Sequence, residues 1–500
     1  MEPLSRRNVL LLGGVGAAAI AAGAAGLLWG KHSSPRTDGG AGLEEPDVLH
    51  SAAGQLDVHL TAAQHQARLA GHDAAVFSYN GSLPGPTLMV QPGDQINLTL
   101  ENQLTQATNL HVHGLHVSPQ GNSDNALISI APGDSFAYQY QLPVEHPPGV
   151  YWYHPHRHGT VADQLFAGLY GAIIVQDPQP LPVTRERVLV ISDISLARDG
   201  SVAQISPMDQ MMGREGALVL VNGQRNPTLR ARPHERQRWR IINACTARYL
   251  KLALDGQSLE LLGLDSGRYP QPRPVDTVLL TPGNRADLLV TATSGTSILQ
   301  TRAVDRGDMG PMMGGTRPGP SRPDQNKVSL ATFQVSGTPA ETADPIPRQP
   351  QSRDLRSETV TARRELVFAM GMGGRSGMDR DSNPSQPGMG PTMMAFTING
   401  QVFDHKRVDI TVSAGGIEEW TLSNTSPMDH PVHLHIWPMQ LIEAQGQPVE
   451  SVEWQDVVNV PAQGSVKVRI AFDHYVGKTV YHCHILDHED LGMMGLLEVR

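Results

Sequence analysis

The stretch 482–493 combines side chains that bind copper. A single cysteine, Cys483, stands between two histidines; His488 follows five positions later, and Met493 lies five positions beyond it. Two imidazoles, one thiolate and a weak axial thioether form a trigonal blue-copper site that transfers single electrons. If residues 481–485 form a strand, Cys483 points to one face and its two histidine neighbours to the other. One metal could then bind in front of the strand and others behind it.

Three more histidine motifs precede this stretch. They are His111-Val112-His113-Gly114, His154-Pro155-His156 and His430-Pro431-Val432-His433-Leu434-His435. A single histidine is most often a surface residue or a satisfied core residue. Histidines two apart on a strand, however, share one face and can serve adjacent metals. Four such motifs together indicate a metal centre that joins distant parts of the chain.

The stretch 482–493 resembles the copper motif HCHxxxHxxxxM of multicopper oxidases, and the other three motifs resemble those of this family in the same order. The resemblance implies four copper ions. It assigns the type 1 copper to His430, Cys483, His488 and, axially, Met493. It assigns the type 2 copper to His111 and His433, and the type 3 pair to His113, His154, His156, His435, His482 and His484.

Two other histidines and three carboxylates lie near these motifs. The spacing alone would admit His158 as a ligand, but the family pattern leaves His158 and His116 out. Asp124 and Glu489 resemble the acidic residues that the family uses to deliver protons to the three-copper cluster, although an ordinary loop Asp and a surface Glu are the alternatives. Asp456 is a candidate partner that orients a type 1 histidine.

Methionines recur in segments rich in Gly, Pro, Ser and charged residues. They surround Met208 and Met309 and fill a Met-rich loop predicted over 370–394. Such segments lack an apolar face, so we expect exposed loops, in which thioethers would select Cu(I). The alternative is loop filler without a role.

These methionines resemble the copper-efflux branch of the family, which binds substrate Cu(I) through Met and Asp beside the type 1 copper. Met428 lies two residues before His430, as in that branch, with Asp429 between them. Ser426, however, stands where the branch has its Asp, which leaves Asp379 or Asp429 as replacements. The substrate-copper candidates are Met428, Asp429, Met370, Met372, Met378, Asp379, Met389, Met393 and Met394.

The resemblance therefore implies an oxidase that couples one-electron oxidation of a substrate to four-electron reduction of O2 to water. The leading hypothesis for the substrate is Cu(I), which would be oxidised to Cu(II) for copper tolerance. A laccase-like oxidase of phenols or aromatic amines is the alternative among enzymes. A copper-binding envelope protein without activity is the alternative of another class. Such a protein should have lost ligand histidines, whereas all ten are present here.

Glycine and proline number 50 and 38 of 500 residues, and short apolar alternations between them indicate strands rather than long helices. The fold class predicted is all-β, with three cupredoxin-like Greek-key β-sandwich domains by resemblance. The boundaries are domain 1 at 51–178, domain 2 at 179–345 and domain 3 at 355–500. Domain 2 lacks histidine pairs and reads as a spacer that positions its neighbours.

The first thirty residues read as an export signal. An arginine pair, Arg6-Arg7, precedes an Ala/Gly/Leu run, which is typical of a twin-arginine signal at 1–30, followed by a polar linker at 31–50. We expect a location in the periplasm or outside the cell, with membrane anchoring as the alternative if the signal is retained. Cys245 has no partner if Cys483 binds copper, so it is expected to be a small buried residue.

The net charge is −10 and no Lys/Arg-rich run occurs, which argues against nucleic acid and anionic membranes as partners. The partners expected are O2 and either Cu(I) or a small phenol. A monomer without a stable membrane partner is expected, because one chain supplies both halves of the cluster.

Overall fold

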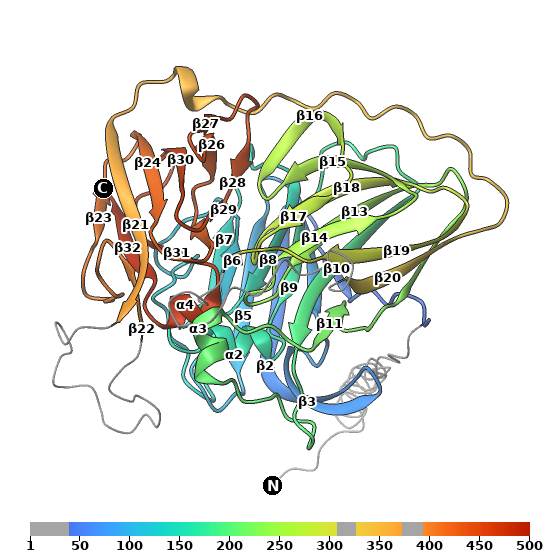
Figure 1. Cartoon of the computed structure of the whole chain (residues 1–500), viewed down its shortest axis with the longest axis horizontal. Helices are drawn as coiled ribbons and strands as arrows, with labels where there is room; N and C mark the ends of the chain where they lie inside the picture. The colour runs from blue at the N-terminus through green and yellow to red at the C-terminus, as the bar shows by residue number, and fades with distance from the viewer. Residues whose placement is uncertain (1–39, 308–326, 373–393) are drawn as a thin grey trace, which may run out of the picture.

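The computed structural model describes residues 40–307, 327–372 and 394–500, and it is built mainly of strands (Figure 1). Six sheets pair into three cupredoxin-like β-sandwiches that follow one another along the chain. In this described part, no helix has the length and apolar character needed to cross a membrane. The predicted signal at 1–30 and the first part of the predicted linker lie outside the described residues.

The first sandwich packs a four-stranded sheet, ordered β3-β2-β5-β7, against a five-stranded sheet, ordered β1-β4-β9-β8-β6. Its strands are β1 (Val48–His50), β2 (Gln55–Leu69), β3 (His72–Tyr79), β4 (Gly85–Val90), β5 (Gln95–Asn102), β6 (His111–His113), β7 (Ser135–Gln141), β8 (Gly149–His154) and β9 (Gly171–Val175). Along β5 buried and half-buried side chains alternate. Strand β8 is buried throughout, because helix α2 (Val161–Phe166) and the second sandwich cover its outer face.

The second sandwich pairs a six-stranded sheet, ordered β11-β10-β13-β18-β15-β16, with a five-stranded sheet, ordered β12-β20-β19-β14-β17. Its elements are β10 (Arg185–Ile194), α3 (Pro207–Met212), β11 (Leu218–Val221), β12 (Thr228–Ala231), β13 (Arg236–Asn243), β14 (Leu250–Leu254), β15 (Ser258–Leu264), β16 (Gly267–Pro274), β17 (Val278–Leu280), β18 (Arg285–Thr291), β19 (Gly295–Arg302) and β20 (Val328–Val335). The sandwich closes on an apolar core of its own.

The third sandwich pairs a larger sheet, ordered β22-β21-β24-β30-β26-β27 with β28 beside β26, with a sheet ordered β23-β32-β31-β25-β29. Its elements are η1 (Leu355–Ser357), β21 (Ala362–Met372), β22 (Met394–Ile398), β23 (Ile410–Val412), β24 (Ile417–Asn424), β25 (His430–Leu434), β26 (Met439–Ala444), β27 (Gln447–Pro448), β28 (Trp454–Gln455), β29 (Val457–Val460), β30 (Ser465–Ala471), β31 (Gly477–Cys483), α4 (Leu486–Asp490) and β32 (Met494–Val499). Its core contains Cys483 and Met493 beside Trp420 and Phe396.

Two strands that carry motif histidines end at the motif itself. The strand with the first histidine pair is only β6, because the chain turns at Gly114, where φ is +85°. A Cβ at Gly114 would lie 2.3 Å from Nη2 of Arg285, so only glycine fits there. The strand predicted over 481–485 ends at Cys483, and α4 begins three residues later.

The prediction of exposed loops is wrong for Met370, and the segment around Met208 is a helix without buried residues rather than a loop. Residues 373–393 of the predicted loop lie outside the described residues. Met370 lies in β21 and is buried in the core of the third sandwich. The segment around Met208 forms helix α3, started by Ser206, whose hydroxyl accepts a hydrogen bond from the Asp209 backbone N–H. Met211 and Met212 of this helix pack against the same core. Methionine is flexible and fills irregular apolar gaps, so composition alone did not reveal these contacts.

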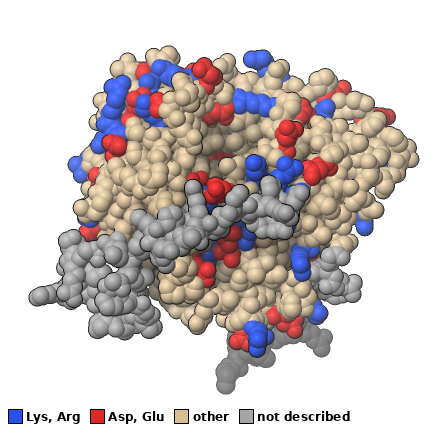
Figure 2. All heavy atoms as spheres, in the orientation of Figure 1, with Lys and Arg blue, Asp and Glu red and all other residues tan. Residues whose placement is uncertain are grey.

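Figure 1 shows the third sandwich on the left, the second on the right and the first between and below them, with α2, α3 and α4 side by side where the three meet. On the face shown in Figure 2, acidic and basic side chains lie among one another over most of the described surface.

Candidate copper centre

The histidine motifs lie on strands of the first and third sandwiches or directly after them, and His488 lies in α4. In the first sandwich β6 pairs with β8, so that His111 lies opposite His154. In the third, β25 pairs with β31, so that His433 lies opposite His482 while Val432 lies opposite Cys483. The alternation of the two strands therefore places the cysteine and the histidines on different faces, as predicted.

Cys483 forms a group with two histidines. Its Sγ lies 3.4 Å from Nδ1 of His430 and 3.8 Å from Nδ1 of His488, and all three side chains are fully buried. The other ring nitrogen of each histidine is held elsewhere: Nε2 of His430 lies 2.8 Å from the Ser426 hydroxyl, and Nε2 of His488 donates to the Met211 carbonyl at 3.0 Å. Both Nδ1 atoms are thereby left facing the sulfur.

A second cluster contains eight buried histidines, which fall into three sets by the nitrogens that face one another. In one set Nε2 of His111 lies 3.3 Å from Nε2 of His433. In another, the Nε2 atoms of His156, His435 and His482 lie 3.1–3.2 Å apart. Two metal–nitrogen bonds of about 2 Å at a tetrahedral angle would separate the nitrogens by about 3.3 Å. The spacing therefore fits shared metal ligands.

In the third set, Nδ1 of His113 lies 3.4 Å from Nε2 of His154, and the His484 ring centroid lies 5.0 Å and 5.7 Å from theirs. Both nitrogens of His484 and Nδ1 of His435 are buried without a hydrogen-bond partner. Buried polar atoms are rarely left unpaired. Imidazole nitrogens that face one another without a hydrogen-bond partner therefore indicate positions for metal ions. A ligand set of imidazoles and a thiolate is typical of copper.

Burial keeps these imidazoles neutral, which is the form that binds metals. It lowers the pKa of His154 and His430 to about 3 and that of His156 to about 4. Burial also raises the pKa of the Cys483 thiol well above its usual value. The thiolate therefore forms when a cation is bound to it rather than in the free protein.

The two predicted proton-delivering carboxylates lie at the histidine cluster on different sides. Both oxygens of Asp124 accept from Nδ1 of His111, at 2.9 and 3.0 Å, and burial raises the pKa of Asp124 to about 8. Oε2 of Glu489 lies 3.0 Å from Nδ1 of His482, and its Oε1 lies 3.4 Å from Nε2 of His156. Burial raises the pKa of Glu489, but the surrounding imidazoles outweigh it and hold the pKa below its usual value.

Asp456 was expected to orient a type 1 histidine, and this prediction is wrong. Its Oδ1 lies 3.0 Å from Nε2 of His113, and its backbone carbonyl accepts from Nδ1 of His433 at 2.7 Å. Both histidines belong to the larger cluster. Sequence spacing could not decide this, because Asp456 lies at the junction of β28 and β29, and β29 pairs with both ends of the motif strand β25.

The described substrate-copper candidates do not form an exposed site. Met428 is fully buried and Met370 nearly so, both in the core of the third sandwich. The Asp429 carboxylate accepts from the Asn459 amide at 2.9 Å and from the Ala462 N–H at 2.8 Å. Met372 and Met394 are at the facing ends of β21 and β22. Met378, Asp379, Met389 and Met393 lie outside the described residues.

The two histidines that the family pattern leaves out have other contacts. Nδ1 of His116 donates to the Ile436 carbonyl at 2.9 Å. The ring of His158 packs edge-on against Phe403, with ring centroids 4.9 Å apart. Cys245 is buried and free, as predicted.

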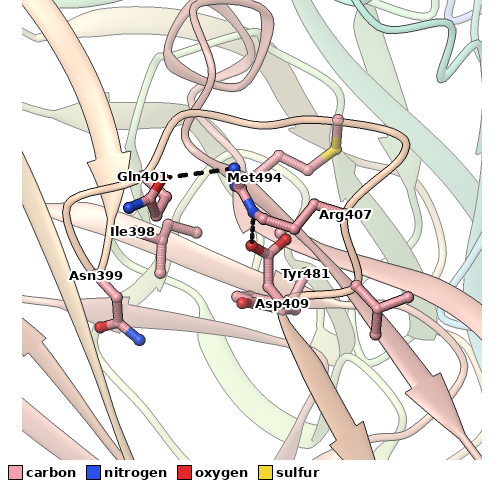
Figure 3. Close-up of a pocket in the computed structure, with 9 residues that line it drawn as sticks. Ile398, Asn399, Gln401, Arg407, Asp409, Tyr481 and Met494 are labelled. Carbon is pink, nitrogen blue, oxygen red and sulfur yellow. Dashed lines mark hydrogen bonds and ion pairs between the residues drawn. The ribbon is translucent and has the colours of Figure 1, made fainter. Parts of the chain in front are cut away.

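A separate pocket of about 340 Å³ lies behind the hairpin of β31 and β32 (Figure 3). It is lined by Tyr481 and Met494, which neighbour His482 and Met493 in sequence, and by an ion pair of Arg407 and Asp409 at 2.6 Å. Neighbours in a strand point to opposite faces, and none of the residues that line the pocket belongs to the histidine or cysteine groups.

Sequence reasoning missed the charged residues that join the sandwiches at the centre. Arg214 binds Asp487 of α4 through Nη2 at 2.7 Å and Asp163 of α2 through Nη1 at 2.6 Å. Arg285, fully buried, binds both oxygens of Asp456. A charged residue at the head of an apolar strand, as in Arg285-Ala286-Asp287-Leu288, was the available signal, because such a residue is rarely buried unless it is paired.

The chain is similar to known proteins over most of its length. Three family models, each described as multicopper oxidase, match residues 61–180, 197–300 and 378–500. The multicopper oxidase mco of Staphylococcus haemolyticus (strain JCSC1435) is 26% identical over 436 residues, which cover 85% of this chain and 83% of that protein. The cell division protein FtsP of Proteus mirabilis (strain HI4320) is 26% identical over 470 residues, covering 91% and 92%.

Among solved structures, one described as a multicopper oxidase from Campylobacter jejuni, a metallo-oxidase, has a TM-score of 0.77 to this chain at 29% identity. The match covers 93% of this chain and 96% of that one. The first and last family-model matches contain all of the histidine groups described above.

Proposed function

Because the chain belongs to the multicopper oxidase family, we propose that it oxidises a reducing substrate one electron at a time at the Cys483 group and reduces O2 to water at the histidine cluster. The observation that carries the proposal is the set of four facing ligand groups, built from all ten predicted histidines and Cys483. When bound, copper would supply the one-electron chemistry and would hold the four electrons, taken one at a time from the substrate, that reduction of O2 to two waters needs.

The residues divide the work as follows. His430, Cys483, His488 and Met493 would hold the type 1 copper; His111 and His433 the type 2; and His113, His154, His156, His435, His482 and His484 the type 3 pair. Cys483 is joined through the backbone to His482 and His484, which belong to the histidine cluster. This short covalent path favours electron transfer from the Cys483 group to the cluster.

Protons for water formation would pass through Asp124 and Glu489. Asp124 has a pKa raised to about 8 by burial, so it can hold a proton at neutral pH beside His111. Glu489, held at ion-pair distance from His482, would present an ionised carboxylate that can accept one. The two groups lie on opposite sides of the cluster and have opposite protonation states, which suits a donor and a relay.

For the reducing substrate we propose Cu(I). The segments that carry methionines contact residues at the Cys483 group. The Met211 carbonyl accepts from His488, and Phe396 of β22 stacks on the same ring with the ring centroids 4.3 Å apart. Gly307 forms a β-bridge with Met428, just before His430. The structurally similar Campylobacter jejuni protein is described as a metallo-oxidase, which agrees with a metal ion as donor. Ser426, in place of a carboxylate, favours the laccase-like alternative.

Oxygen uptake by the copper-loaded protein, with Cu(I) or a phenol as donor, separates these functions. We expect fast uptake with Cu(I) and slow phenol oxidation unless Cu(II) is added. In a variant that joins Met372 to Met394 by an Asn-Gly turn in place of 373–393, Cu(I) turnover should fall at least about tenfold while phenol oxidation persists. The turn is compatible with the pairing of β21 and β22.

An equal loss of both activities in this variant would contradict the Cu(I) proposal. Fast phenol oxidation with negligible Cu(I) turnover would make the protein laccase-like. No uptake with either donor at full copper loading would favour a copper-binding envelope protein without activity. The twin-arginine segment supports export as part of the same proposal.

A further inference from the structure

Arg285 is a fully buried cation where the three sandwiches meet. It is the first residue of β18 in the second sandwich. Its Nε donates to the Val150 carbonyl of the first sandwich at 2.9 Å. Its Nη1 and Nη2 donate to the two carboxylate oxygens of Asp456 in the third, at 2.5 and 2.8 Å. One side chain of the domain without ligands thus contacts both domains that carry them.

Asp456 in turn holds a histidine from each of these domains. Its Oδ1 accepts from Nε2 of His113, and its backbone carbonyl accepts from Nδ1 of His433. The opposite nitrogen of each ring faces the ligand sets: Nδ1 of His113 faces His154, and Nε2 of His433 faces His111. A hydrogen bond to the outer nitrogen fixes the tautomer and the rotation of a metal-binding imidazole.

The backbone around Asp456 is held from the second sandwich as well. Asp265 accepts from the N–H groups of Arg285 at 2.9 Å and of Asp456 and Val457 at 3.2 Å. The preceding turn approaches the cluster directly, since a Cβ at Gly283 would lie 2.8 Å from Nε2 of His484. The second sandwich therefore forms one wall of the histidine cluster rather than a remote spacer.

We propose that Arg285 is a positioning residue for the histidine cluster, because its bidentate contact fixes Asp456, whose carboxylate holds the ring of His113 and whose backbone carbonyl holds that of His433. The proposal rests on the proposed function in that these rings hold copper. Lysine would keep the charge but offers a single point of attachment, whereas the planar guanidinium matches both carboxylate oxygens.

Arg238 provides a matched control for a role in packing alone. It lies on β13, which pairs with β18, and is also fully buried. It binds both oxygens of Asp287, at 2.8 Å and 2.5 Å, and one oxygen of Asp177 at 2.5 Å. The structure gives it no contact with a histidine of the cluster. Arg238→Lys should therefore reproduce the loss of a buried bidentate pair without moving a ligand.

The test compares copper-loaded wild type, Arg285→Lys and Arg238→Lys by copper content, thermal unfolding and spectra. We expect Arg285→Lys to weaken copper retention at the histidine cluster about 10- to 100-fold and to change the electron paramagnetic resonance of the copper held by His111 and His433. The visible absorption of the Cys483 copper should stay within the range of wild type, and Arg238→Lys should lower the Tm with unchanged spectra.

Equal spectra and equal copper retention in the two variants would overturn the proposal. If Arg285→Lys does not fold, Asp456→Asn keeps the size of the side chain and the backbone carbonyl. Asp456→Asn should then perturb only the ligand set that contains His113. An unchanged spectrum would again overturn the proposal. Wild type that binds no copper would instead refute the proposed function.

Discussion

Burial decides the protonation of the histidines, and this gives the copper-free protein a specific response to acid. The pKa of His154 and His430 is lowered to about 3 and that of His156 to about 4, because their charged forms would lose hydration. In the unfolded chain such rings titrate at about 6.5. Below that pH the unfolded state binds protons that the folded state does not.

We therefore expect the copper-free protein to lose stability as the pH falls from about 6.5 toward these lowered values. Above that pH the rings do not reduce the free energy of unfolding. Between pH 6.5 and 5.5 each ring lowers it by about 1 kcal/mol, or by about 3 kcal/mol for the three. Urea unfolding at several pH values would measure it. His430→Gln should reduce the pH dependence and His59→Gln, whose side chain is 61% exposed, should not. A free energy of unfolding that does not change over this range would refute the expectation.

Residue types and spacing indicated a metal centre, since a thiolate between imidazoles has few other uses, and the resemblance to multicopper oxidases assigned the residues to ligand groups. The roles of Ser426 and Asp456 could not be predicted in this way. Ser426 is close to His430 in sequence, but its contact with Nε2 depends on the rotation of that ring. Asp456 reaches His113 only after sandwiches from both halves of the chain have docked.

At the scale of elements, the three short helices form a junction that fixes α4, the helix that carries His488. Arg214 follows α3 and binds Asp487 within α4, and its backbone N–H donates to the same carboxylate at 2.8 Å. Asp163 of α2 completes the junction. Burial raises the pKa of Asp487, and Arg214 opposes that shift. The ion pair offsets part of the cost of burying this carboxylate.

Replacing Arg214 with methionine should destabilise the protein by about 3–5 kcal/mol, because Asp487 would remain buried without its cation. The visible absorption of the Cys483 copper should also change, since α4 orients His488. Arg353→Met, which removes a half-exposed ion pair with Glu358, should cost no more than about 1 kcal/mol. Adding Asp487→Asn should restore part of the stability of Arg214→Met. No difference between the two single variants would contradict this role.

The strands were largely predictable, because alternation of apolar side chains reports directly on the two faces of a sheet. Strands β5 and β30 show this alternation of buried and half-buried side chains. The ends of β6 and β31 were not predictable, since they depend on contacts from other sandwiches, such as Arg285 against Gly114. The same applies to α3, which is too short for a helical period to show in the sequence and whose Met211 and Met212 pack against the core of the third sandwich.

At the scale of the whole molecule, the ligand sets bind the first and third sandwiches to each other. Each of the three histidine sets contains residues from both sandwiches: His111 with His433, His156 with His482, and His113 with His484. Metals bound in these sets would act as crosslinks between residues that are more than 300 positions apart in the sequence. The order of the motifs along the chain made the docking of these two sandwiches predictable. The contribution of the second sandwich to the site could not be predicted, because that sandwich supplies no ligand.

Removing copper should therefore lower the Tm and reduce the cooperativity of unfolding. A ligand that binds only the folded state at 1,000 times its Kd adds about 4 kcal/mol per site, so several sites should shift the Tm by well over 10 °C. Differential scanning calorimetry of copper-loaded and chelator-treated protein would measure the shift. The variant His111→Ala, copper-loaded, should fall between the two. Equal Tm values with and without copper would refute the interdomain role.

The pairing of β25 with β31 has a consequence for biosynthesis. A nascent chain folds its N-terminal sandwich first, yet the histidines of β6 and β8 find their counterparts only when β31 has been made and has paired with β25 and β32. Until then the first sandwich presents imidazoles without the residues that complete their sets. Acquisition of the metals is thereby deferred until β31 has been made, which protects the growing chain from capturing the wrong ion at an incomplete site.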